Sequence, residues 1–266
     1  MNEAPSLTGS ARTHPPVNSS VTHLSTRTQL PSCHRAACVG PPAQAGIGSL
    51  AVINETSDAR PLDAQLLAMD STAGYGEAAE ALAEQYESVT FAEVHREVLH
   101  LFPAQPGSVL DVGAGSGRDA AALAARGHRV VAAEPTAELR ELGQSIHADR
   151  DIEWVGDALP ELPGLTAEQR RFDLILLTAV WMHLDAEERA TAMSRLAALL
   201  AERGRLILSL RHGPVPEGRR MFAVTAQETI DLAHEHGLAV LHVARREDPH
   251  ARAGVSWTYL AFSSSP

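Results

Sequence analysis

The chain has 266 residues, 44% of them hydrophobic, which is enough for one sizeable α/β core. Its formal net charge of −11 disfavours a partner with a phosphate backbone. All 22 basic residues are arginine, which excludes phosphate-loop lysines, lysine Schiff bases and Tyr/Lys dehydrogenase pairs. No apolar stretch reaches the roughly 20 residues of a membrane helix and no basic segment precedes an apolar one at the N-terminus, so we expect a cytoplasmic protein without a membrane partner.

The first part of the chain differs in composition from the rest. Residues 1–68 are rich in Pro, Ser, Thr, Gly and Ala and show no sustained apolar period, which predicts a disordered tail before a folded domain at 69–266. The tail holds both cysteines, Cys33 and Cys38, with His34 between them. A second ligand pair at zinc-like spacing is missing, so we predict neither a metal site nor a disulfide framework.

After this tail the pattern becomes helical from Ala78 to just before Pro103, and then short apolar runs alternate with amphipathic stretches. The predicted strands are 108–112, 128–134, 151–156, 172–180, 205–211, 238–245 and 255–262. The predicted helices between them are 118–127, 136–148, 186–204 and 225–237. This alternation predicts a doubly wound, mostly parallel α/β sheet of seven strands with helices on both faces. No helix separates the last two strands, which predicts an antiparallel last strand.

A glycine-rich turn follows the first predicted strand. Gly113, Gly115 and Gly117 stand at relative positions 0, 2 and 4, whereas a dinucleotide fingerprint has glycines at 0, 2 and 5; Arg118 occupies that last position. A pyrophosphate site is therefore disfavoured. Asp111 lies two residues before the first glycine, and a carboxylate there suits a cationic ligand better than an anion.

The stretch DVGAGSG resembles motif I of the class I S-adenosylmethionine-dependent methyltransferases, whose cofactor carries a sulfonium, an amino group and a ribose. Glu134 ends the second strand, 23 residues after Asp111, where a carboxylate can accept hydrogen bonds from both ribose hydroxyls. Asp157 follows the third strand, where this family places an acid against the adenine amine. Two simpler roles stay open, a helix cap for Glu134 and a turn former for Asp157.

The resemblance covers roughly residues 75–262 and implies S-adenosylmethionine as the cofactor. GYGEAAEALAEQYESV is similar to N-terminal helices that close over the cofactor in small-molecule members, where a tyrosine reaches the methionine end; Tyr86 matches it best and Tyr75 second. The implied cofactor-binding residues are Tyr86, Asp111, Gly113, Ala114, Gly115, Gly117, Glu134, Pro135, Asp157, Ala158, Leu159, Thr178 and Ala179.

Missing motifs narrow the methyl acceptor. The fourth strand lacks the Asn/Asp-Pro-Pro-aromatic box of amino methyltransferases, the folded domain has no cysteine for cytosine carbon methylation, and the chain has no lysine for ribose methylation. We therefore expect a small-molecule acceptor, methylated at oxygen or nitrogen, and no nucleic acid. His183 in VWMHL is the candidate general base, because its ordinary pKa is near 6.5, although a core or capping histidine is the simpler alternative. Arg211 and His212 are candidates for holding an anionic acceptor.

Two other functions are compatible with parts of this pattern. A catalytically silent protein would keep the cofactor pocket but fill the space beside the methyl group with Trp181 or with the loop at 211–222. A nicotinamide-dependent oxidoreductase is disfavoured by the glycine spacing and by the missing lysine.

Overall fold

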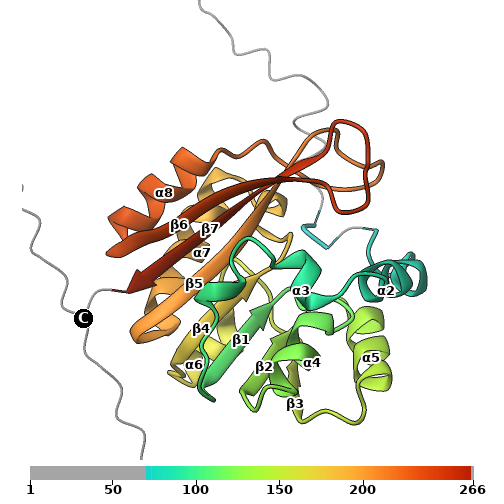
Figure 1. The fold of residues 1–266 in the computed structure, drawn as a ribbon, viewed down its shortest axis with the longest axis horizontal. Helices are drawn as coiled ribbons and strands as arrows, with labels where there is room; N and C mark the ends of the chain where they lie inside the picture. Colours follow the sequence, from blue (N-terminus) through green and yellow to red (C-terminus); the bar gives the residue numbers. More distant parts are fainter. Residues whose placement is uncertain (1–69, 73, 265–266) are drawn as a thin grey trace, which may run out of the picture. The chain divides into compact units, whose positions relative to one another are not determined.

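The computed structural model describes residues 70–72 and 74–264, so the predicted tail at 1–68, with both cysteines, lies outside the described residues. One seven-stranded sheet runs through the described part, in the order β3-β2-β1-β4-β5-β7-β6 (Figure 1). Its strands are β1 Ser108–Val112, β2 Arg129–Ala133, β3 Ile152–Val155, β4 Phe172–Leu177, β5 Leu200–His212, β6 Leu238–Glu247 and β7 Ser256–Ser264.

The strand directions confirm the predicted fold class. Strands β1 to β5 pair in parallel, and β7 runs antiparallel to both of its neighbours, β5 and β6. The chain moves outward from β1 through β2 to β3 and then returns to β4 on the other side of β1. Strand order therefore reverses between β1 and β4, and such a switch point is where ligands bind in open α/β sheets.

Helices cover both faces of the sheet, as expected for right-handed crossovers between parallel strands. α3 and α4 lie in front of the sheet in Figure 1, whereas α6 and α7 lie behind it. The α-helices are α2 Ala79–Glu87, α3 Phe91–Val94, α4 Arg118–Ala124, α5 Ala137–Ile146, α6 Pro163–Ala167, α7 Ala186–Leu199 and α8 Ala226–Glu235, and two 3₁₀ turns span Leu99–Leu101 and Trp181–His183.

Two predicted helices are wrong in extent. The helical pattern expected from Ala78 to just before Pro103 forms only the short helices α2 and α3 and one 3₁₀ turn. Thr90 caps α3: its hydroxyl accepts from the Glu93 N–H, and the Glu93 carboxylate accepts from the Thr90 N–H. The helix expected over 186–204 ends at Leu199, and the chain enters β5 instead. The second error lies where good helix formers continue past a real boundary.

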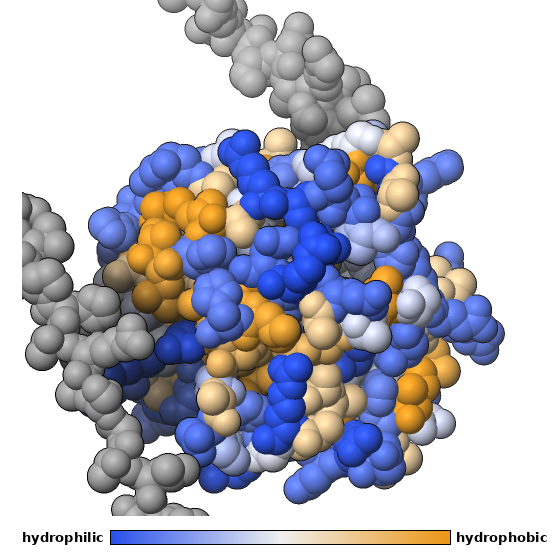
Figure 2. Space-filling view, in the orientation of Figure 1, coloured by the Kyte–Doolittle hydropathy of each residue, from blue (hydrophilic) through white to orange (hydrophobic). Residues whose placement is uncertain are grey.

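The sheet supplies most of the core, and its far edge stays open. In β4, Leu174, Ile175 and Leu177 are fully buried, as two-sided coverage of a parallel strand requires. The edge strand β6 exposes apolar side chains, which gather toward the left of the face seen in Figure 2; those on β6 are Val240, Leu241 and Val243. Within the described ranges, no helix is long and apolar enough to cross a membrane.

Candidate functional site

A cavity of about 580 Å³ opens at the carboxyl ends of β1 and β4, at the switch point of the sheet. Its size lies within the range of small-molecule sites. The cavity is lined by all but one of the residues predicted for the cofactor and for catalysis, namely Tyr86, Asp111, Gly113, Ala114, Gly115, Glu134, Pro135, Asp157, Ala158, Leu159, Thr178, Ala179 and His183. The exception is Gly117, which faces the Trp154 ring instead.

The turn after β1 requires glycine for two reasons, its positive φ angles and the close approach of neighbouring side chains. Gly113 and Gly115 have φ values of +68° and +58°, which side-chain-bearing residues rarely adopt. A Cβ on Gly113 would lie 2.5 Å from a Val180 methyl group, and one on Gly115 would lie 3.1 Å from the Tyr86 ring. The glycines therefore let the turn approach the cavity closely, as the sequence predicted.

Gly117 has a packing role that a matched pair of variants can measure. A Cβ on Gly117 (φ +88°) would lie 2.6 Å from the Trp154 ring, whereas one on Gly127 (φ +86°) meets nothing nearer than 3.5 Å. We expect Gly127→Ala to cost about 1–2 kcal/mol of unfolding free energy from the left-handed backbone alone. Gly117→Ala is expected to cost about 1–3 kcal/mol more, because its methyl group would overpack against the Trp154 ring. Urea denaturation measures both, and equal losses would contradict the Trp154 contact.

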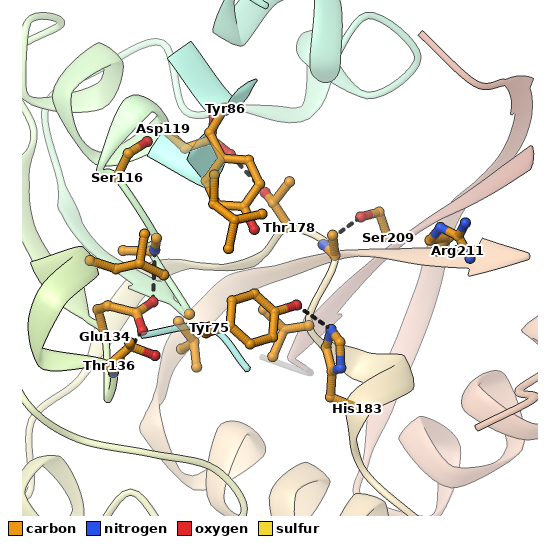
Figure 3. Close-up of a pocket in the computed structure, with 18 of the residues that line it drawn as sticks. Tyr75, Tyr86, Ser116, Asp119, Glu134, Thr136, Thr178, His183, Ser209 and Arg211 are labelled. Atoms are coloured by element: carbon orange, nitrogen blue, oxygen red, sulfur yellow. Dashed lines mark hydrogen bonds between the residues drawn. The ribbon is translucent and has the colours of Figure 1, made fainter. Parts of the chain in front are cut away.

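Glu134 lies at the end of β2, and two backbone groups fix its buried carboxylate. The Gly115 N–H donates to Oε2 at 2.8 Å and the Thr136 N–H donates to Oε1 at 2.8 Å (Figure 3). Burial raises the pKa of this carboxyl, while the two N–H groups lower it. Each oxygen keeps a further lone pair, so the carboxylate can accept additional donors from the cavity.

Asp111 is the next-to-last residue of β1 and is almost completely buried. Its Oδ2 is buried without a hydrogen-bond partner among the described residues. Burial, and then the negative charge of Asp119, raise the pKa of Asp111 well above its ordinary value. An orphaned carboxylate oxygen beside a cavity is a place for a donor from a bound ligand.

Asp157, after β3, uses both carboxylate oxygens on local backbone. Oδ1 accepts from the Ala158 N–H at 3.2 Å, and Oδ2 accepts from the Leu165 N–H at 2.9 Å. These two hydrogen bonds correspond to the turn-forming role, the simpler alternative for Asp157. Asp157 still lines the cavity beside Ala158 and Leu159, so the three predicted acids, at 111, 134 and 157, meet at one cavity.

His183 follows β4 and is hydrogen-bonded on both ring nitrogens. Its Nδ1 lies 2.7 Å from the Arg220 carbonyl oxygen, which can only accept, so Nδ1 carries the proton. Nε2 is then the lone-pair nitrogen, and the Tyr75 hydroxyl donates to it at 3.0 Å (Figure 3). Burial lowers the pKa of His183, and Arg219 and Arg220 lower it further, which keeps the ring neutral. This Tyr75–His183 pair joins residues 108 positions apart.

A buried network behind the glycine turn was not predicted. The Asp119 carboxylate accepts from His95 at 2.8 Å, from the Thr178 hydroxyl at 2.7 Å and from Arg118 Nε at 2.7 Å. Burial raises the pKa of Asp119, but His95 and Arg118 lower it far more, so the group is a carboxylate. The network ties α3 and α4 to the end of β4. GSGRD, with its acid in the first helical turn, was the available signal.

The turn after β4 lines the cavity through Thr178, Ala179 and Val180. Ala179 has a φ of +62°, a strained conformation for alanine, and its N–H donates to the Ser209 hydroxyl on β5 at 2.9 Å. Trp181 and Met182 are buried in the core and do not line the cavity. Trp181 therefore does not fill the cavity, whereas the loop at 211–222, the other filler expected of a silent protein, does line it through Pro216, Glu217, Arg219 and Met221.

A doubly wound sheet with a glycine turn after its first strand and a carboxylate after its second defines a Rossmann-like nucleotide-cofactor enzyme. Residues 82–264 match a family model described as a methyltransferase domain, so the chain belongs to the methyltransferase domain family. The prediction of an S-adenosylmethionine-dependent methyltransferase is confirmed, and the oxidoreductase alternative is wrong. No curated protein sequence matches the chain.

Solved structures share the fold at low identity. A 1,6-didemethyltoxoflavin-N1-methyltransferase from Burkholderia thailandensis, solved with that compound and S-adenosylhomocysteine, has a TM-score of 0.58 and 23% identity over 76% of this chain and 89% of its own. The magnesium protoporphyrin IX methyltransferase of Synechocystis, solved with S-adenosylmethionine, has a TM-score of 0.52 and 19% identity over 74% and 87%. A TehB-like methyltransferase from Corynebacterium glutamicum has a TM-score of 0.54 and 19% identity over 71% of this chain and 99% of its own.

Proposed function

We propose that the cavity binds S-adenosylmethionine at its acidic end and that the enzyme methylates an oxygen or nitrogen of a small-molecule acceptor held on the His183 side. The observation that carries this proposal is the placement of Glu134 and Asp111 at one end of a cavity whose other wall presents the Tyr75–His183 pair. Two neighbours of similar fold are named for small-molecule acceptors, a toxoflavin precursor and magnesium protoporphyrin IX.

The residues at the acidic end fit this cofactor. The two backbone N–H groups hold the Glu134 carboxylate with lone pairs left for the ribose hydroxyls. The orphaned Oδ2 of Asp111 suits the positively charged amino group at the methionine end. Leu159 and Ala158 offer apolar contact for the adenine ring. When bound, S-adenosylmethionine supplies an electrophilic methyl group.

The chain then has two tasks, alignment and proton removal. In-line methyl transfer requires the acceptor atom to be held against the donor, which the cavity walls and Tyr86 accomplish by position. An acceptor O–H or N–H that donates to the Tyr75 oxygen releases its proton there, while the Tyr75 proton passes to His183 Nε2. The Arg220 carbonyl, which accepts from Nδ1, stabilises the resulting imidazolium.

The pH profile of turnover follows from the lowered pKa of His183. A base works in its unprotonated form, so kcat is expected to fall as pH drops through a pKa below 6.5 and to stay level above it. Turnover assays with methyl-labelled S-adenosylmethionine from about pH 5 to about pH 8 measure this profile. A profile that keeps rising above pH 7 or thereabouts would assign the proton removal to another group.

Cofactor binding is expected to depend on pH through Asp111. Burial raises the pKa of this carboxyl, and an ammonium group beside it favours the carboxylate form. Binding should therefore release a proton, and affinity should weaken as pH falls through the raised pKa. Calorimetry in buffers of different ionisation enthalpy measures the released proton. Asp111→Asn is the matched control and should bind without proton release; release that persists in this variant contradicts the assignment.

Label transfer tests the function as a whole. The protein is incubated with methyl-labelled S-adenosylmethionine and a cell extract separated into small molecules, protein and nucleic acid. We expect label in the small-molecule fraction. Label confined to protein or nucleic acid would contradict the acceptor class. Cofactor binding without label in any fraction would favour the silent regulatory alternative.

A further inference from the structure

Apart from Arg118, which is ion-paired with Asp119 at 2.7 Å, the basic and acidic residues lining the cavity lie largely on opposite sides of it. Asp111 lies on β1, Asp119 on α4, Glu134 directly after β2 and Asp157 in the loop after β3. Arg211 lies on β5, and Arg219 and Arg252 lie in the loops that follow β5 and β6. In Figure 3, Glu134 and Arg211 lie at opposite ends of the view, with Tyr75 and His183 between them. Glu217 is the one acid among the lining residues beyond β4, and it is exposed.

The pairing of β5 with β7 places Arg211 in a wall of the cavity together with three other side chains. Arg211 on β5 pairs with Trp257 on β7, and Ser209 pairs with Tyr259 two positions earlier. Residues two apart on a strand, and the partners directly opposite them, project from the same face of a sheet. All four side chains line the cavity, so a guanidinium, a hydroxyl and two aromatic rings form one wall.

Arg211 differs from its paired neighbours on this side of the molecule. Arg252 is held by the Asp248 carboxylate at 2.7 Å, and Arg220 is held by Glu188 at 2.7 Å. Arg211 donates to the Pro214 carbonyl at 2.8 Å, but in the described part of the chain no carboxylate lies within ion-pair distance of it. Its Nε is buried without a hydrogen-bond partner among those residues.

The surroundings of Arg211 disfavour its positive charge. Burial and then the nearby positive charge of Arg252 lower the pKa of Arg211. A chain with a net charge of −11 has ample carboxylates to pair with this arginine, yet none of the described ones does so. A half-buried guanidinium facing a cavity with unused donors matches the planar geometry of a carboxylate.

We propose that the methyl acceptor is an organic anion whose carboxylate or similar oxyanion binds Arg211. The inference rests on the proposed function, since it assigns the basic end of the cavity to the acceptor. Trp257 and Met221 offer apolar contact for the body of the acceptor, and the Tyr75–His183 pair faces its reactive atom. The protein as a whole repels anions, so this local reversal of charge selects for one.

Benzoate and benzamide test the site directly, because they share size and shape and differ in charge. Calorimetric titration of the full chain saturated with S-adenosylhomocysteine should show benzoate binding about tenfold more tightly than benzamide. Arg211→Gln should abolish this preference, and Arg211→Lys, which keeps the charge, should retain part of it. Arg245→Gln on the exposed side of β6 makes the same change of net charge outside the cavity and should leave the preference intact.

The outcomes decide the proposal independently of turnover. Equal binding of the two probes, no detectable binding of benzoate, or a benzoate preference that survives in a folded Arg211→Gln protein would each overturn it. Failure of the proposed function gives a different result, since benzoate would still bind at Arg211 while no small molecule became labelled.

Discussion

Glu134→Gln is expected to weaken S-adenosylmethionine binding about 100-fold, or about 2.7 kcal/mol. The carboxylate accepts from the N–H groups of Gly115 and Thr136, one on each oxygen. Glutamine replaces one oxygen with an NH₂ group, which faces a backbone donor and cannot accept from a ribose hydroxyl. Hydrogen bonds to a charged acceptor contribute about 1.5–3 kcal/mol, so losing them accounts for the expected change. Calorimetric titration with the cofactor measures it.

The control for this variant is Glu141→Gln, which makes the same change of charge on an exposed position of α5. It should bind the cofactor as tightly as the unchanged protein. If both variants retain full affinity, the ribose does not lie at Glu134. Circular dichroism shows whether the Glu134→Gln protein keeps its fold.

His183→Ala and Tyr75→Phe are each expected to lower kcat about 100-fold or more, which is the usual contribution of a positioned base. The two losses should be similar, because the proton passes through the Tyr75 hydroxyl to His183 Nε2 in one chain of hydrogen bonds. Cofactor affinity should stay unchanged in both variants, since neither group belongs to the acidic end. Turnover of the labelled small molecule found in the extract is the measurement.

Tyr259→Phe is the matched control for the tyrosine variant. Its hydroxyl donates to the Val94 carbonyl at 2.6 Å, so the change removes a buried hydrogen bond in the same cavity without touching His183. We expect a loss of about 1 kcal/mol in unfolding free energy. We expect little change in kcat, because phenylalanine keeps the aromatic ring that lines the cavity and only the hydroxyl is lost. A large loss for His183→Ala with none for Tyr75→Phe would make His183 the direct base. Unchanged turnover in the His183 variant would remove it from the mechanism.

The fold was largely predictable because apolar strands buried on both faces leave a strong signal. All seven strands were predicted in the right order along the chain, but the position of β7 between β5 and β6 was not. The boundary at Leu199 was missed because the residues around it are good helix formers, while the pairing of Leu200 with Phe172 on β4 draws the chain into the sheet. The break at Thr90 was predictable from its capping box with Glu93.

The two halves of the site differed in predictability. The cofactor side lies within one stretch of spaced glycines and strand-end acids, so the residues that meet there were visible in the sequence. The Tyr75–His183 pair and the unpaired donors of Arg211 depend on contacts between distant segments and on which carboxylates pair elsewhere. Spacing carries no information of that kind.

A crystal structure of the protein in complex with S-adenosylhomocysteine would show where the cofactor lies. We expect its ribose hydroxyls within hydrogen-bonding distance of Glu134, its amino group beside Asp111, and its sulfur turned toward Tyr75 and His183. A ligand bound outside this cavity, or one whose sulfur faces away from the Tyr75–His183 pair, would contradict it.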